Sequence, residues 1–243
     1  MNRLAVVVAI AACSGKSGGK TVRVAAASDL ARAFEEVKKE FEKKTGIEPI
    51  IDFNSSGLLA KQIEEGAPYF LFAAANKSYV DQVVAKGRCD GSTAQLYSRG
   101  HVVVWTKGAA PRQLAELADS RFARIAIANP DHAPYGAAAK QVLENAKLWD
   151  ALQSRLVIAD SVQGAMTYAR EGQADAAIVA LSLAVVTDGG AYLKVEPALF
   201  APLEQTLVVC GNGSESDAAR QLAQFIMSND GREIMSRYGF GLK

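Results

Sequence analysis

The sequence predicts an α/β fold built from largely parallel sheets flanked by helices. Short runs rich in Val, Ile and Ala alternate with longer runs whose apolar residues recur every three or four positions. The first pattern is typical of buried strands and the second of amphipathic helices. Because strands and helices take turns along the chain, we expect parallel strands that are joined by helical connections.

The expected elements begin at residue 21. The run TVRVAAA predicts a strand over 21–27, and the apolar spacing of DLARAFEEVKKEFEKKT predicts a helix over 29–45. Gly46 is the expected stop of this helix, since glycine accepts the left-handed conformation at a helix end. The continuous apolar run YFLFAAA predicts a buried strand over 69–75. By the same criteria, the further strands expected are 47–53, 101–107, 124–130, 155–160, 174–181 and 206–210. The further helices expected are 58–66, 77–87, 111–118, 137–152 and 162–172.

Composition and charge limit the possible functions. The chain has 243 residues, of which 49% are hydrophobic and 22% charged, so it can form one large domain or two lobes. Its formal net charge is +1, and no basic stripe is interleaved with aromatic residues. These features exclude a nucleic acid or another polyanion as the expected partner. Nothing in the sequence requires more than a monomer.

Residues 1–20 have the pattern of an export signal followed by a linker. Arg3 precedes nine apolar residues at 4–12, which are too few to span a bilayer but enough for a signal-peptide core. The run ending in Cys13 resembles the bacterial lipobox, and a lipid on Cys13 would tether the protein to a membrane surface; simple cleavage after small residues is the alternative. The Ser/Gly/Lys-rich residues 14–20 predict a flexible linker. We therefore expect a periplasmic or cell-envelope protein.

Two further cysteines, Cys89 and Cys210, would then lie in a compartment where disulfides persist. One bond between them is possible. Alternatively, a cysteine in a strand such as 206–210 is a small buried hydrophobic residue. The sequence alone leaves both interpretations open.

Several strand-to-helix junctions carry residues that suit an anion. In open α/β sheets, ligands bind beyond the carboxyl ends of the strands, and free amides and the dipole at a helix start favour negative charge. None of the junctions has Arg or Lys at the turn, so an anion would be held by amides and neutral hydroxyls. Alternatively, the serines simply cap helices. The junctions are Ser28 with Asp29, Ser55 with Ser56, Tyr135 with Gly136, and Ser161 with Val162.

At these junctions the sequence resembles a known family. The segments AAASDLARAFEEV, FNSSGLLAKQIEEGAP, FAAANKSYVDQVV, NPDHAPYGAAAKQVL, DSVQGAM and EIMSRYGF together resemble the periplasmic molybdate-binding proteins of bacterial ABC importers. The resemblance extends over about 21–243. It implies the type II periplasmic binding protein fold, in which two lobes close over molybdate or tungstate in the cleft between them.

The resemblance also implies how the chain is divided. Residues 1–20 would be the signal and linker, 21–100 with 203–243 the first lobe, and 101–202 the second. The crossovers would fall near 99–105 and 202–209. They would bring Cys89 and Cys210 toward the same region, which favours a disulfide.

The family pattern can be carried over to five positions as oxyanion ligands. Ser28 would give a hydroxyl and an amide, and Ser56 a hydroxyl. Asp29 would add a backbone amide, with its carboxylate pointing away from a dianion. Tyr135 and Val162 would donate backbone amides from the second lobe.

Other positions are alternatives to the pattern or depart from it. Ser55 is the less favoured neighbour of the matching serine. Ala180 stands where some members place a tyrosine hydroxyl on the anion, so that donor is absent. Tyr69 and Phe70 follow the GAP turn, where members commonly have Pro-x-Asp.

The expected function is a receptor without catalysis or cofactor that delivers molybdate or tungstate to an ABC permease in the membrane. Cavity size would select against sulfate, whose bonds are shorter. The alternative is another small anion, such as sulfate, phosphate or an organic anion. A protonated phosphate would need an acceptor, for which Asp29 and Asp160 are candidates; capping or solvent exposure is the favoured role for both.

An enzyme is the least favoured class. The only histidines are His101, on an expected crossover strand, and His132, in a loop. From residue 21 onward the sequence contains no GxSxG, HExxH or P-loop pattern and no Cys/His spacing typical of zinc sites. A single loop histidine usually faces solvent.

Overall fold

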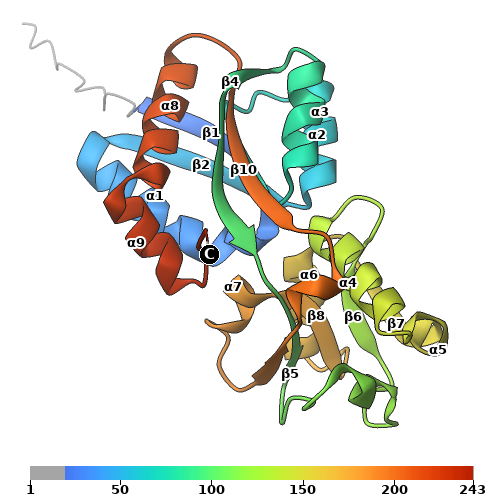
Figure 1. The fold of residues 1–243 in the computed structure, drawn as a ribbon. Coiled ribbons are helices and arrows are strands. Elements are labelled where there is room, and N and C mark those ends of the chain that lie inside the picture. Colours follow the sequence, from blue (N-terminus) through green and yellow to red (C-terminus); the bar gives the residue numbers. More distant parts are fainter. Residues whose placement is uncertain (1–19, 243) are drawn as a thin grey trace, which may run out of the picture.

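The computed structural model describes residues 20–242. The predicted signal segment and Cys13 lie outside this range. The described residues form two five-stranded sheets with helices on their faces, one sheet in each lobe (Figure 1). No helix in this range is long and apolar enough to cross a membrane.

The first sheet has the strand order β2-β1-β3-β10-β4. Strands β2 and β3 both pair in parallel with β1, whereas β10 pairs antiparallel with β3 and with β4. Strand β10 is therefore reversed relative to its neighbours. The strands are β1 (Lys20–Ala27), β2 (Ile47–Asn54), β3 (Leu71–Ala74), β4 (Cys89–Gly100) and β10 (Leu203–Cys210).

The second sheet repeats this design with the order β7-β6-β8-β5-β9. Strands β7 and β8 pair in parallel with β6, and β5 pairs antiparallel with β8 and β9. Both sheets are thus mixed, with one reversed strand in each, which agrees with the prediction of largely parallel sheets. The strands are β5 (Val102–Thr106), β6 (Ile125–Ala128), β7 (Leu156–Ala159), β8 (Ala176–Ala180) and β9 (Ala191–Lys194).

The reversed strands belong to the connections between the sheets. The chain leaves the first sheet at Gly100, the end of β4, and enters the second at Val102. It returns along β10, which lies beside β4 (Figure 1). Cys89 and Cys210 face each other at the outer ends of these two strands and form a disulfide.

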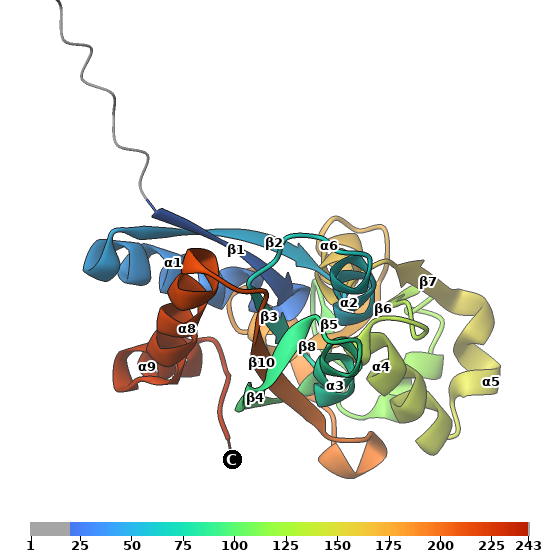
Figure 2. The same cartoon turned by 90° about the horizontal axis from the view of Figure 1, so that it is seen from above.

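Within the described residues, five helices cover the first sheet. Helices α1, α8 and α9 lie on one side of it, and α2 and α3 lie on the other (Figures 1 and 2). Helix α1 buries Phe34, Val37 and Phe41 and ends at Gly46, whose φ of 70° is left-handed as expected. The helices are α1 (Ala31–Thr45), α2 (Ser56–Glu64), α3 (Lys77–Ala85), α8 (Ser214–Met227) and α9 (Asn229–Arg237).

The helices of the second lobe differ in part from expectation. The predicted helix over 137–152 is two helices, because Lys147 adopts a φ of 60° between them. Helices α4 and α6 both pack on β6 and β8, from opposite sides (Figure 2). The helices are α4 (Pro134–Asn145), α5 (Trp149–Leu152), α6 (Val162–Arg170) and α7 (Leu181–Ala184).

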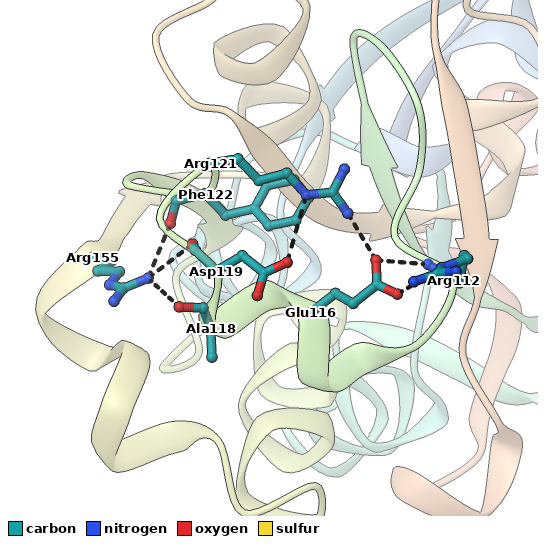
Figure 3. A network of polar contacts seen from close by, with 7 residues as sticks. All are labelled: Arg112, Glu116, Ala118, Asp119, Arg121, Phe122 and Arg155. Carbon is teal, nitrogen blue, oxygen red and sulfur yellow. Dashed lines mark hydrogen bonds and ion pairs between the residues drawn. The ribbon is translucent and has the colours of Figure 1, made fainter.

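The predicted helix over 111–118 is only a 3-10 turn, Leu114–Ala118. A network of polar contacts holds this turn in place (Figure 3). The Glu116 carboxylate accepts hydrogen bonds from Arg112 and Arg121, which lower its pKa, the backbone bond from Arg112 most. Arg155 donates to the main-chain oxygens of Ala118 and Asp119. Such exposed pairs contribute little stability individually, so they fix the position of the loop more than they stabilise the fold.

Candidate functional site

A small cavity lies where the two lobes meet. Its walls come from the end of β1, the β2–α2 junction, the start of α4 and the start of α6. The space open to the centre of a water-sized sphere is about 10 Å³. The five positions that the family pattern selected all line it: Ser28, Asp29, Ser56, Tyr135 and Val162.

Three helices begin at this cavity. Ser56 and Val162 are the first residues of α2 and α6, and Tyr135 is the second residue of α4. First-turn N–H groups have no carbonyl partner within their own helix, and the helix dipole adds partial positive charge at this end. Three converging helix starts therefore surround the cavity with donors, although no Arg or Lys among residues 20–242 lines it.

The hydroxyls of Ser28 and Ser56 do not cap the helices in which they lie. The interpretation of these two serines as simple helix caps is therefore wrong. Ser56 Oγ accepts a hydrogen bond from Ala75 N at 3.0 Å, and Ser28 Oγ accepts one from Gln163 N at 3.4 Å. Ser55 occupies the N-cap position of α2 but makes no side-chain cap bond. Ser161 does cap, by accepting from Gly164 N at 3.2 Å. Since a hydroxyl that accepts one bond keeps its own proton, Ser28 and Ser56 can each still donate.

Asp29 is the one acidic residue that lines the cavity within the described range. It is buried, with 1% of its surface exposed, so the expectation of solvent exposure or capping is wrong for this residue. Asp160, the other carboxylate considered, is exposed. No ion pair involves Asp29 within the described range, and its Oδ1 has no hydrogen-bond partner there. Burial raises the pKa of Asp29 to about 6.

Gln205 connects Asp29 to the second lobe. Its Nε2 donates to Asp29 Oδ2 at 2.6 Å and to the hydroxyl of Tyr135 at 3.0 Å. Burial raises the pKa of Tyr135 and of its neighbour Tyr97 well above the ordinary range. Gln205 lies on β10, close to the crossover, and no pattern in the sequence had selected it.

Direct hydrogen bonds join the lobes around the cavity. Gly57 N donates to the main-chain oxygen of His132 at 2.9 Å, and Ser55 Oγ lies 2.8 Å from His132 Nδ1. Ser182 Oγ donates to the main-chain oxygen of Asp29 at 2.9 Å. The lobes are therefore in a closed arrangement. His132 is half-buried and bonded, contrary to the expectation for a loop histidine.

Ala180 is fully buried at the end of β8 and does not line the cavity. Its methyl group offers no donor in place of a tyrosine hydroxyl. Within residues 20–242, no three His, Cys, Asp or Glu side chains are grouped so that they could hold a metal ion.

The bacterial extracellular solute-binding protein family matches residues 22–241, nearly the whole described chain. The chain belongs to this family. Its relatives at about 30% identity include molybdate-binding proteins of Azotobacter vinelandii and Rhodobacter capsulatus. The first is 31% identical over 100% of this chain and 98% of its own, and the second is 30% identical over 90% and 87%. A putative ABC transporter substrate-binding lipoprotein of Bacillus subtilis is 28% identical over 90% of this chain and 86% of its own.

Solved structures confirm the two-lobed fold. The periplasmic molybdate-binding protein of Azotobacter vinelandii superposes with a TM-score of 0.87 at 29% identity and covers 91% of this chain and 99% of its own. A sulfate-binding protein of Mycobacterium tuberculosis has a TM-score of 0.76 at 14% identity over 91% and 86%. This second likeness concerns the fold alone.

Proposed function

We propose that this protein binds molybdate or tungstate between its lobes and delivers it to the membrane permease of an ABC importer. The observation that carries the proposal is the cavity at which three helix starts and the hydroxyls of Ser28 and Ser56 meet. The names of the relatives support the choice of ligand, since several are molybdate-binding proteins at about 30% identity over most of the chain.

Each ligand would have a defined role. The hydroxyls of Ser28 and Ser56 donate hydrogen bonds to oxyanion oxygens, and Asp29 contributes its backbone N–H. Tyr135 and Val162 contribute backbone N–H groups from the second lobe. Because donors come from both lobes, the anion is fully bound only in the closed form, so ligand and closure stabilise each other.

Size decides which anion fits. Molybdate, tungstate and sulfate share charge and tetrahedral shape, but the metal–oxygen bonds are longer. Donors fixed at hydrogen-bond distance from the larger ion leave sulfate with longer, weaker bonds. We therefore expect molybdate and tungstate to displace each other and sulfate to compete poorly.

The lobes and the cellular location complete the proposal. The strands of the first sheet lie within 21–100 and 203–243 except for Lys20, and those of the second lie within 101–202, which supports the predicted lobe boundaries. The protein acts outside the cytoplasm, either free in the periplasm or tethered through a lipid on Cys13. It acts as a monomer, and its contribution is binding rather than catalysis.

Calorimetry of ligand-free protein with molybdate, tungstate, sulfate and phosphate tests the proposal. We expect one-to-one binding of molybdate and tungstate. Ser28→Ala or Ser56→Ala should each weaken molybdate binding by about tenfold to a hundredfold, because a hydrogen bond to a charged group is worth roughly 1.5–3 kcal/mol.

Ser92→Ala serves as a control, since this serine bonds to Asp90 on an exposed part of β4, away from the cavity. It should bind as the wild type does. Binding of phosphate or sulfate in preference to molybdate would assign the cavity to another small anion. Absence of binding by all four anions would reject the oxyanion proposal.

A further inference from the structure

The lobes approach each other closely at Gly57, outside the proposed anion ligands. This residue is the second of α2, in the first lobe, and its N–H donates to the main-chain oxygen of His132 in the loop before α4. A Cβ at position 57 would lie 2.6 Å from that oxygen and 2.9 Å from the His132 Cβ. Only glycine therefore allows the two segments to touch.

A second bond ties the same two segments together. Ser55 Oγ lies 2.8 Å from His132 Nδ1, and Ser55 is buried, with 3% of its surface exposed. Because Ser55 does not cap α2, its hydroxyl is explained by the contact with His132. Ser55 lines the cavity, whereas His132 and Gly57 do not.

These contacts exist only when the lobes are together. Gly57 and Ser55 belong to the β2–α2 junction, whereas His132 belongs to the loop between β6 and α4 of the other sheet. Separation of the lobes would break both bonds and return their groups to water. They contribute stability to the closed form and none to the open one, so they bias the equilibrium between the two.

We propose that Gly57, Ser55 and His132 form a closure latch, which holds the lobes together through contacts between these residues rather than through the anion and which requires glycine at position 57. This inference rests on the proposed function, since it concerns the closed state in which the anion is bound. The latch residues are positioning residues: they act on the anion through the separation of the lobes.

Gly57→Ala is the most direct test. The added methyl group cannot fit against the His132 backbone, so the lobes should close incompletely. We expect the Kd for molybdate to rise about tenfold or more, the expected consequence of overpacking at an interface, with a faster dissociation rate. The ligand-free variant should melt no lower than wild type, because alanine favours the helix more than glycine does.

Two variants complete the comparison. His132→Ala removes the imidazole without adding bulk and should raise the Kd about threefold to tenfold, as expected for one lost hydrogen bond. Gly108→Ala is the matched control, since an added Cβ there meets no atom within 4 Å. It should leave the Kd for molybdate unchanged.

Small-angle X-ray scattering, with and without molybdate, provides a readout of closure itself. The wild type with molybdate should be the most compact state, and Gly57→Ala should remain more extended at saturating molybdate. If Gly57→Ala binds within twofold of wild type and contracts equally, the latch is refuted. If the wild type binds no oxyanion, the proposed function fails; the latch then stands only if ligand-free Gly57→Ala is more extended than ligand-free wild type, and is refuted if the two are equal.

Discussion

Replacing Cys89 and Cys210 together with alanine is expected to lower the free energy of unfolding by about 4–5 kcal/mol. The disulfide joins residues that are 121 positions apart, so it removes a large loop-closure entropy from the unfolded chain, which is the main source of its stabilisation in the chain-entropy model. Urea denaturation of the oxidised wild type and the double variant measures the difference directly.

Reduction of the disulfide should lower the stability as much as its removal by substitution. Wild-type protein unfolded in urea with excess dithiothreitol should show the lower stability of the double variant, and the reductant should not change the variant. Molybdate binding should persist in the folded variant, because the disulfide lies at the ends of β4 and β10 opposite to the crossovers. Equal unfolding midpoints for wild type and variant would contradict the prediction.

Local patterns were sufficient to predict most of the fold. The spacing of Phe34, Val37 and Phe41 marks one face of α1, and that face is buried in the structure. Gly46 ends the helix because its left-handed φ disfavours any other residue. Such features depend on a few neighbouring residues, and a sequence reveals them.

Two features that the sequence did not predict have different causes. Strand β4 has the polar sequence CDGSTAQLYSRG with little alternation, and it forms because β10 pairs with it along most of its length. The break at Lys147 lies within a run whose apolar spacing suits one continuous helix. For β4 a tertiary contact decides what local propensity leaves open. At Lys147 local main-chain bonds close the helix, since Lys147 N donates to Glu144 O and Leu148 N to Leu143 O.

The candidate site divides in the same way. The strand-to-helix junctions indicated Ser28, Ser56 and Val162, because the position of a helix start follows from local sequence. Gln205 and His132 could not be selected, since each becomes relevant only through a contact with the other lobe. The one local signal of this contact between the lobes is Gly57. A glycine in the first turn of a helix can indicate a close approach of another backbone segment.

Replacing Asp29 with asparagine (Asp29→Asn) is expected to stabilise the protein at neutral pH and to remove much of its pH dependence between about pH 4 and 7. Burial raises the pKa of Asp29 from 3.8 to about 6 in the folded state. The folded protein therefore holds this proton more tightly than the unfolded chain does. The stability that protonated Asp29 contributes is fully present below about pH 4 and is lost as the pH rises through about 6. This loss lowers the free energy of unfolding by an amount on the order of 3 kcal/mol. Urea denaturation at about pH 4.5 and about pH 7.5 should show a gain for the variant mainly at the higher pH.

The same substitution tests how the carboxylate affects the anion. The asparagine side chain leaves the backbone N–H in place and keeps an oxygen for Gln205 Nε2, but it brings no negative charge to the cavity wall. An ionised Asp29 repels a dianion in a site whose described lining holds no Arg or Lys, so at about pH 7.5 the variant should bind molybdate more tightly than wild type. The molybdate affinities of variant and wild type should converge toward about pH 5, where the wild-type carboxyl is protonated. A variant that binds more weakly at every pH would instead show that the Asp29 carboxylate itself helps to hold the ligand.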